Sequence, residues 1–277
     1  MKIGMHPSIT NLTIETSTYC NAECLICPNS QSEYKRKPHL MPLQEFENIL
    51  ISFPNLSSIA LSGCYEPLSD NRLPQIFDVI KKVNPKMNVT IFSNGSLLHK
   101  WEDILLSNEN LSSIIFSVHG FTPTIYNKIM KNLDRDKTYN NIIQFLKKRR
   151  QLKKINPKIS VTFVRTSLNV NELNDFIKFW KEYPLDNIHN FELMNWNGKV
   201  LDYDNLIDKP KIIPRQCPEY DNPLVIDAYG DIVRCCYDIS FSYGNVFDNG
   251  IDKYLAKKRI SDTYPDFDCI KCDGWKI

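Results

Sequence analysis

The chain has 277 residues, a hydrophobic fraction of 42%, a charged fraction of 24% and a formal net charge of +2. This length accommodates one barrel-sized domain and a small second unit, and the composition is ordinary for a globular protein. The small net charge creates no strong field toward nucleic acid or a membrane surface. No apolar run approaches the ~18 residues that a membrane span needs. We therefore expect no nucleic-acid partner and no membrane association.

The chain contains nine cysteines, and its first seven residues hold no apolar signal core. Without a secretion signal, cysteines are expected as reduced thiols or metal ligands rather than as disulfides. The sequence therefore predicts a cytoplasmic protein.

Six short β-rich runs alternate with helical patterns. The expected strands are Leu12–Thr16, Ser58–Leu61, Asn88–Phe92, Ser113–Val118, Ile159–Arg165 and His189–Leu193. The expected helices lie around Leu43–Ile51, Leu73–Val83, Leu98–Leu106, Thr138–Leu152 and Glu172–Lys181. Such alternation implies a parallel sheet with helices outside it. Six units are fewer than the eight of a closed barrel, so the predicted α/β fold is an open, partial (β/α)6 TIM-like barrel over residues 1–200.

The pattern changes after Trp196. Residues 200–222 carry several aspartates and prolines, which indicates a connector. Residues 224–236 hold two β-rich runs joined at Tyr229-Gly230-Asp231, which predicts a hairpin. With a short helix at Ile251–Ile260, they form an expected second unit over residues 201–277.

Three cysteines follow the first expected strand with the spacing C-x3-C-x2-C: Cys20, Cys24 and Cys27. A structural zinc site needs four ligands, and this loop supplies three. Three thiolates on one loop can hold three irons of a cubane [4Fe–4S] cluster and leave the fourth iron open. An open iron can bind a small chelating ligand and pass an electron to it.

Polar residues also follow the next three expected strands. The segment Gly63-Cys64-Tyr65-Glu66-Pro67 follows the second strand, and Ser93-Asn94-Gly95 follows the third. Ser117 ends the fourth strand, with His119 in the next turn. Because βα loops converge at the carboxyl ends of barrel strands, we expect all of these residues on the face where barrel active sites form.

Together these motifs resemble the radical S-adenosylmethionine (SAM) enzyme superfamily from residue 10 to about residue 200. The resemblance implies that Cys20, Cys24 and Cys27 hold a [4Fe–4S] cluster whose open iron chelates SAM. One electron then cleaves SAM to a 5′-deoxyadenosyl radical, which abstracts a hydrogen atom from the substrate. A reductase such as flavodoxin or ferredoxin is the expected electron donor. The alternative is a zinc loop or a set of buried thiols.

The resemblance also implies contacts with SAM. The residues concerned are Ile26, Gly63, Glu66, Pro67, Ser93, Asn94, Gly95, Ser117 and Arg165. Gly63 and Glu66 match the family's G-x-x-E-P stretch, where the SAM amino group needs an acceptor and a closely approaching backbone. Ile26 is expected against the adenine. Arg165 is expected at the SAM carboxylate, or else in a salt bridge on the barrel rim.

A second set of cysteines lies toward the end of the chain: Cys217, Cys235, Cys269 and Cys272. Their arrangement, C-x12-G-x4-C followed by C-x2-C, resembles the short "twitch" variant of the SPASM extension. That extension holds an auxiliary [4Fe–4S] cluster, and four protein ligands would restrict this cluster to electron transfer. A zinc ribbon built from the same four sulfurs is the alternative.

Two reactions fit these motifs. The first is oxidation of a carbinol-type carbon in a small polar molecule, with the auxiliary cluster accepting the electron. The second is a cross-link, thioether or epimerisation in a ribosomal peptide; the first expected strand begins near residue 11, which leaves little room for a leader-binding domain. The proposed proton acceptors or hydrogen donors are Tyr65, Cys64, Arg165 and His119. A zinc-stabilised binding module would not explain the strand-end motifs.

Overall fold

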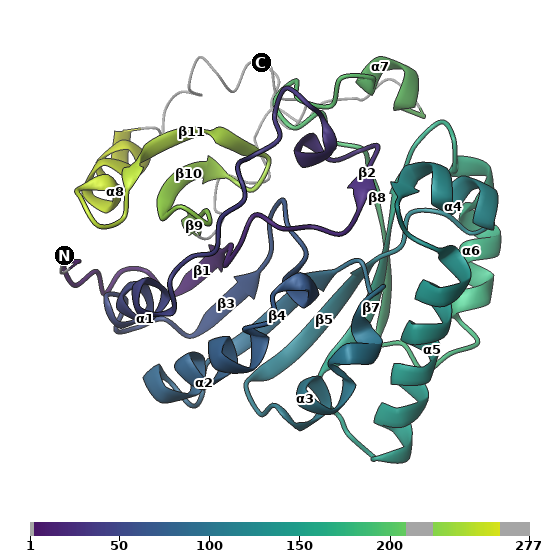
Figure 1. The fold of residues 1–277 in the computed structure, drawn as a ribbon, viewed down its shortest axis with the longest axis horizontal. Coiled ribbons are helices and arrows are strands. Elements are labelled where there is room, and N and C mark those ends of the chain that lie inside the picture. Colours follow the sequence, from purple (N-terminus) through teal and green to yellow (C-terminus); the bar gives the residue numbers. More distant parts are fainter. Residues whose placement is uncertain (1–2, 209–223, 261–277) are drawn as a thin grey trace.

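The computed structural model describes residues 3–208 and 224–260 (Figure 1). The strands of its main sheet are β1 (Asn11–Ile14), β3 (Ser58–Leu61), β4 (Asn88–Ser93), β5 (Leu111–Ser117), β7 (Lys158–Arg165), β8 (Asn187–Glu192), β9 (Leu224–Ile226), β10 (Asp231–Cys235) and β11 (Asp238–Asn245). Two short strands, β2 (Glu23–Cys24) and β6 (Met130–Lys131), form a separate antiparallel pair.

The helices alternate with the barrel strands. They are α1 (Leu43–Ile51), α2 (Leu73–Val83), α3 (Glu102–Ser107), α4 (Pro123–Ile129), α5 (Arg135–Gln151), α6 (Leu173–Trp180), α7 (Tyr203–Leu206) and α8 (Gly250–Ile260). Short 3-10 helices are η1 (Pro28–Ser30), η2 (Pro67–Ser69), η3 (Leu98–Lys100) and η4 (Val170–Glu172). No helix within residues 3–208 and 224–260 has both the length and the apolar character that crossing a membrane requires.

The main sheet has the strand order β11-β10-β9-β1-β3-β4-β5-β7-β8. From β1 to β8 neighbouring strands are parallel, and the helices α1, α2, α3, α5 and α6 cover the convex side (Figure 1). The prediction of a partial (β/α)6 barrel is confirmed. Each expected barrel strand occurs, with ends shifted by two residues at most.

The spacing of apolar residues explains how a helix such as α2 packs against the core. Leu73, Ile76, Phe77 and Ile80 recur at helical intervals and are all buried, so they form one apolar face of α2. Proline at the first turn is tolerated because the amide there has no helical partner. The helix is therefore anchored by a single face, with Lys81 and Lys82 in its last turn.

Alternate residues of the barrel strands point to opposite sides of the sheet. Phe116 packs against Phe145 of α5, with ring centroids 6.5 Å apart, and Phe163 packs against Phe176 of α6 at 4.7 Å. The intervening residues therefore face the concave side. On β4, β5, β7 and β8 this concave wall consists of Asn88, Thr90, Phe92, Ser113, Ile115, Ser117, Lys158, Ser160, Thr162, Val164, Asn187, His189 and Phe191.

The C-terminal strands continue the same sheet. β9 pairs in parallel with β1, and β9 and β10 form the expected antiparallel hairpin. Gly230 lies in its turn with a φ of +83°, a backbone conformation that favours glycine. β11 then pairs with β10, a strand that the sequence pattern did not predict. The division into units at residues 200 and 201 stays a prediction.

Candidate functional site

The three cysteines lie in a long loop between β1 and α1. At its base the loop closes on itself: the amide of Thr18 donates to the carbonyl of His39 at 3.0 Å, and the amide of Met41 donates to that of Thr16 at 2.9 Å. We name residues 36–41, which lead out of the loop, the return arm. Cys20, Cys24 and Cys27 are thus held together beyond the carboxyl end of β1.

Neighbouring segments position the individual thiols. The strand pairing of β2 with β6 holds Cys24, whose Sγ lies 3.6 Å from the sulfur of Met130. The amide of Ala22 donates to Cys20 Sγ at 3.4 Å, and the Cys64 thiol donates a hydrogen bond to Cys27. All of these cysteines are free thiols.

The match of this loop to an iron–sulfur cluster rests on its donor set. Soft thiolates favour iron–sulfur clusters over hard cations. In the part of the chain that the structure describes, no three His, Cys, Asp or Glu side chains are grouped closely enough to hold a metal ion. Burial raises the pKa of the Cys24 thiol, so cluster binding must displace its proton.

A buried ion pair that sequence reasoning missed fastens the return arm to the end of β1. Glu15 is 1% exposed, and its carboxylate accepts hydrogen bonds from the Arg36 guanidinium and, at 2.6 Å, from the amide of Cys64. Arg36 also donates to the carbonyl of Cys64 at 3.0 Å. A Cβ on Gly63 would lie 2.2 Å from Glu15 Oε1, so glycine is required there. The sequence feature that could have indicated this ion pair is Glu15 itself, an acidic residue directly after an apolar strand.

Glu66 lies at the centre of the strand-end motifs. Its carboxylate accepts hydrogen bonds from the Ser93 hydroxyl at 2.7 Å, the Asn94 amide at 2.7 Å and the Leu68 amide at 3.0 Å. The amide of Glu66 donates to the carbonyl of Tyr19, next to the first cysteine. Burial raises the pKa of Glu66 to about 7 despite these donors. Because burial disfavours the charged carboxylate, a further hydrogen-bond donor or a positive charge beside Glu66 would stabilise it.

The end of β4 is tied to the cysteine loop by amide side chains. Asn94 donates to Asn21 Oδ1 at 2.9 Å, and Asn21 donates to the Ser96 hydroxyl at 2.8 Å. Gly95 has a φ of +75° and packs against Phe116 and Ile142. The structure thus brings Glu66, Ser93, Asn94 and Gly95 to the cysteine loop. Asn21 was missed because nothing in the motif marks it.

The remaining expected SAM contacts lie around the same strand ends. Pro67 is the first residue of η2, which Glu66 caps, and Ile26 is buried between two of the cysteines. Ser117 is partly exposed on the concave wall, in register with Thr162. Contacts of these residues with SAM stay predictions.

Two of the proposed catalytic residues are buried at the end of β3. The Tyr65 hydroxyl donates to the carbonyl of Ile14 at 3.5 Å, and burial raises its pKa. Cys64 is 2% exposed and bridges Cys27 and Glu15 through its thiol and its amide. Tyr65 therefore contacts the end of β1 and Cys64 contacts the cysteine loop, and the catalytic roles of both residues stay predictions.

The other two proposed catalytic residues are also engaged. His119 is buried, its Nδ1 accepts a hydrogen bond from the amide of Val164 at 3.2 Å, and burial lowers its pKa to about 4. Arg165 lies on the convex side with Phe163, and it pairs with Glu192 at 2.9 Å and Asp208 at 3.4 Å. The salt bridge on the rim is thus the alternative that the geometry favours for Arg165.

Of the four cysteines expected to hold an auxiliary cluster, only Cys235 lies within the described residues, at the end of β10. Cys217, Cys269 and Cys272 lie outside them, so the second cluster stays a prediction. Beside Cys235, Asp238 pairs with Lys199 at 2.8 Å and with Arg234 at 3.1 Å, in a buried group that the sequence did not predict.

The concave wall is mostly uncharged and partly open to solvent. Of its side chains, named above, only Lys158 is charged, and it pairs with Asp186 at 3.2 Å at the amino end of β7. Phe92 on β4 is 37% exposed and Phe191 on β8 is 54% exposed, unusually open for aromatic residues of a sheet. The His189 and Phe191 rings lie 6.0 Å apart and nearly parallel. This wall offers apolar surface and neutral hydrogen-bonding groups.

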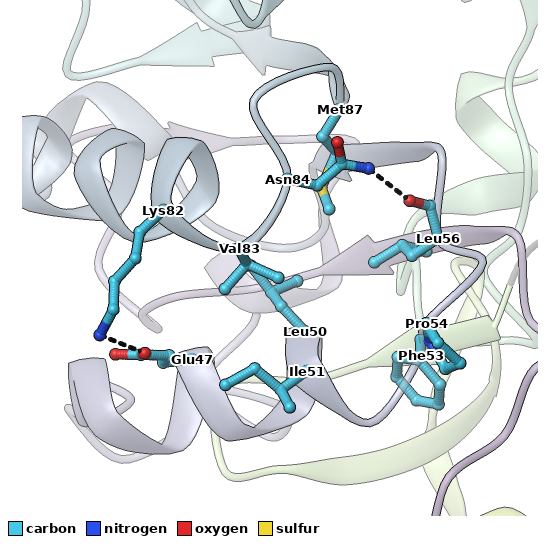
Figure 2. Close-up of a pocket in the computed structure, with 10 residues that line it drawn as sticks. All are labelled: Glu47, Leu50, Ile51, Phe53, Pro54, Leu56, Lys82, Val83, Asn84 and Met87. Atoms are coloured by element: carbon cyan, nitrogen blue, oxygen red, sulfur yellow. Dashed lines mark hydrogen bonds and ion pairs between the residues drawn. The ribbon is translucent and has the colours of Figure 1, made fainter.

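A separate pocket lies at the opposite edge of the sheet, where α1 and α2 end (Figure 2). Leu50, Phe53 and Met87 line it, with an ion pair of 2.5 Å between Lys82 and Glu47 at its side. None of the predicted site residues lines this pocket, so it is distinct from the strand-end site.

The sequence of residues 14–180 matches the Radical SAM superfamily. The match covers more than half of the chain, so the protein belongs to this superfamily and is a radical SAM enzyme. Membership implies SAM and a [4Fe–4S] cluster as cofactors, and the predicted resemblance is confirmed at this level. The donor set of the cysteine loop fits such a cluster.

Known sequences similar to this chain include GTP 3′,8-cyclases. The enzyme of Clostridium botulinum (strain Okra / Type B1) is 24% identical over 213 residues, which cover 75% of this chain and 64% of that protein. A probable GTP 3′,8-cyclase of Sulfurisphaera tokodaii is 27% identical over 190 residues, 67% of this chain and 56% of that protein. The chain therefore spans less than two thirds of the length of these relatives.

Solved structures of similar fold are radical SAM enzymes. Streptococcus suis SuiB bound to the precursor peptide SuiA has a TM-score of 0.71 at 15% identity, covering 98% of this chain and 71% of that one. The enzyme anSMEcpe with AdoMet and the Cp18Cys peptide has a TM-score of 0.65 at 17% identity, with coverage of 95% and 86%. BtrN with AdoMet and 2-DOIA has a TM-score of 0.55 at 15% identity, with coverage of 92% and 88%. These identities establish the shared fold.

Proposed function

We propose that this radical SAM enzyme abstracts a hydrogen atom from an uncharged residue of a peptide substrate. The observation that carries this proposal is the concave wall, where Phe92 and Phe191 are 37% and 54% exposed and Lys158, at the amino end of β7, is the one charged side chain. A bound apolar group would cover this surface and gain roughly 25 cal/mol for each Å² removed from water.

The same wall argues against a nucleoside triphosphate. Recognition of phosphate groups normally uses arginine forks or lysine ammonium groups. Among the concave residues of β4, β5, β7 and β8 the one lysine or arginine is Lys158, which lies at the amino end of β7, opposite the strand-end site, and pairs with Asp186 at 3.2 Å. We therefore do not extend the reaction of the GTP 3′,8-cyclases to this chain. The likeness of the fold to SuiB and anSMEcpe, both solved with peptides, supports the peptide instead.

The chain's own residues have assignable tasks in this function. The cluster and SAM, when bound, supply the 5′-deoxyadenosyl radical. Glu66 would accept a hydrogen bond from the SAM amino group, because its buried carboxylate lies beside the cysteine loop. Asn94 and Asn21 hold the loop at the end of β4. The concave wall would orient the substrate and keep water from the reacting carbon.

A second candidate is oxidation of a carbinol-type carbon in a small polar molecule. Ser117, Thr162 and His189 occupy register-paired positions on three adjacent strands, a row of neutral groups able to hydrogen-bond a polyol. The fold of BtrN, solved with 2-DOIA, supports it. An auxiliary [4Fe–4S] cluster on Cys217, Cys235, Cys269 and Cys272 would accept the electron of this oxidation.

The test uses anaerobically reconstituted enzyme with SAM and dithionite. Peptides encoded near the gene, GTP and 2-DOIA are supplied separately, and products are analysed by mass spectrometry. We expect a peptide product, and at least a tenfold lower kcat/KM in Phe191→Ala, since that change removes most of an exposed ring. Leu152→Ala is the control, because Leu152 is also 54% exposed but follows α5 at the opposite edge of the sheet. Turnover of GTP would refute the proposal, and oxidation of 2-DOIA would establish the second candidate.

A further inference from the structure

We propose that the turn between β9 and β10 supports the SAM-cluster site, because Tyr229 in this turn holds the return arm of the cysteine loop. On this view Tyr229 is a positioning residue: it acts through the return arm and contacts neither the cluster nor SAM. The inference depends on membership of the superfamily and not on the identity of the substrate.

Tyr229 makes two contacts with the return arm, across 192 residues of sequence. Its hydroxyl donates a hydrogen bond to the carbonyl of Lys37 at 2.6 Å. Its ring stacks on that of His39, with centroids 4.9 Å apart and an interplanar angle of 27°. A directional hydrogen bond and an aromatic contact together fix both the position and the orientation of the arm.

The return arm passes this restraint to the cysteines. The carbonyl of Lys37 also accepts a hydrogen bond from the Thr18 hydroxyl at 3.0 Å. The amide of His39 donates to the same hydroxyl at 2.8 Å, and the amide of Thr18 donates to the carbonyl of His39 at 3.0 Å. Thr18 stands two residues before Cys20. The segment that enters the cysteine loop is therefore fastened to the two residues that Tyr229 holds.

The turn itself is rigid enough to act as a support. The Asp227 carboxylate accepts hydrogen bonds from the amides of Tyr229 and Asp231, each at 2.9 Å. The parallel pairing of β9 with β1 is extended by a bond from the amide of Glu15 to the carbonyl of Ile226 at 3.0 Å. The turn is thus fixed beside the strand from which the cysteine loop departs.

The cysteine loop is consequently held from two sides. The barrel holds the return arm through the ion pair of Arg36 with Glu15, and the C-terminal hairpin holds it through Tyr229. Loss of the second restraint would broaden the conformations of the loop. Three thiols that are less well oriented would hold the cluster less tightly and present its open iron to SAM less well.

The experiment compares reconstituted holoenzymes in the absence of substrate. Tyr229→Phe removes only the hydrogen bond, Tyr229→Ala also removes the stacking, and His39→Ala removes the stacking from the other partner. Tyr34→Phe is the matched control, because Tyr34 lies in the same loop and its hydroxyl makes no hydrogen bond within the described residues. The readouts are the rate of iron loss to a chelator and the shift that SAM causes in the EPR signal of the reduced cluster.

We expect iron loss about fivefold faster in Tyr229→Phe, the change that corresponds to one hydrogen bond of about 1 kcal/mol. The expected increase is larger in Tyr229→Ala, together with a weakened EPR response to SAM. The effects of Tyr229→Ala and His39→Ala should be non-additive in the double variant, because they remove the same contact. Only the SAM-binding cluster responds to SAM, so the EPR readout is specific to it.

Rates and EPR spectra of Tyr229→Phe and Tyr229→Ala equal to those of Tyr34→Phe would overturn the inference. Additive effects of Tyr229→Ala and His39→Ala would overturn the route through His39. Thermal unfolding of each variant shows whether it is folded, and Tyr229→Phe keeps the test decisive if the alanine variant is not. Because no substrate is present, failure here is distinct from failure of the proposed peptide reaction.

Discussion

Replacement of Glu66 by glutamine should change how the stability of the protein depends on pH. Glu66 is 2% exposed, and burial raises its pKa from the ordinary value of 4.5 to about 7. Between these values the folded protein binds the proton more tightly than the unfolded chain does. The stabilisation from this proton is therefore complete below pH 4.5 and is lost as the pH rises through about 7.

The size of the effect follows from the pKa. Each pKa unit corresponds to about 1.4 kcal/mol, so ionisation of Glu66 in the folded protein costs about 3 kcal/mol by pH 8. Glutamine is neutral at every pH and removes this dependence. Its amide NH₂ group would also face the donors of Ser93, Asn94 and Leu68, which lowers the unfolding free energy. This loss is the same at each pH.

The assay is urea unfolding of cluster-free protein between pH 5 and pH 8, followed by tryptophan fluorescence. From pH 5 to pH 8, the unfolding free energy of the wild type should fall by about 2.5 kcal/mol relative to Glu66→Gln, because part of the loss already occurs below pH 5. Other titrating groups are common to both proteins and cancel in the difference. A difference that stays constant within about 1 kcal/mol across this range would refute the account of Glu66.

Three further substitutions test the supports of the site, each by urea unfolding. Gly63→Ala places a Cβ 2.2 Å from Glu15 Oε1 and should cost about 2 kcal/mol more than Gly198→Ala, where φ is also positive but no atom lies within 4 Å; equal costs would contradict the steric argument. Arg36→Gln leaves the Glu15 carboxylate buried and unpaired, with an expected loss of about 3–5 kcal/mol that a second change, Glu15→Gln, should largely restore. His119 has its pKa lowered by burial from 6.5 to about 4, so its stabilisation is present above pH 6.5 and is lost as the pH falls toward 4. In His119→Gln about 3 kcal/mol of this acid sensitivity should disappear, and an unchanged slope would count against a buried neutral imidazole.

The fold was largely predictable because its signals are local. Apolar spacing placed α1 and α2 with their observed bounds, helped by Pro42 just before α1 and Pro74 in the first turn of α2. The same kind of signal was present for α4, where Thr122 caps the helix and Pro123 begins it, but seven residues gave too short a periodic pattern. The pairs β2–β6 and β10–β11 depend on contacts with other segments, so alternation along the chain could not reveal them.

The site was predictable only where its residues form short motifs. Glu66, Ser93 and Asn94 were found because each follows a strand directly, and strand ends converge. The pairing of Glu15 with Arg36 spans 21 residues and depends on the path of the loop. The orientation of Arg165 depends on which side of β7 it occupies, which only the register and the neighbouring helix determine.

The pairing of β9 with β1 has a consequence for the order in which the protein assembles. One edge of β1 pairs with β3. The other edge pairs with β9, Leu224–Ile226, which lies more than 200 residues later in the chain. During synthesis the first strand therefore stays half-paired until β9 has left the ribosome. The loop that departs from this strand gains all of its contacts only then, so we expect iron–sulfur insertion to follow the emergence of β9 and Tyr229.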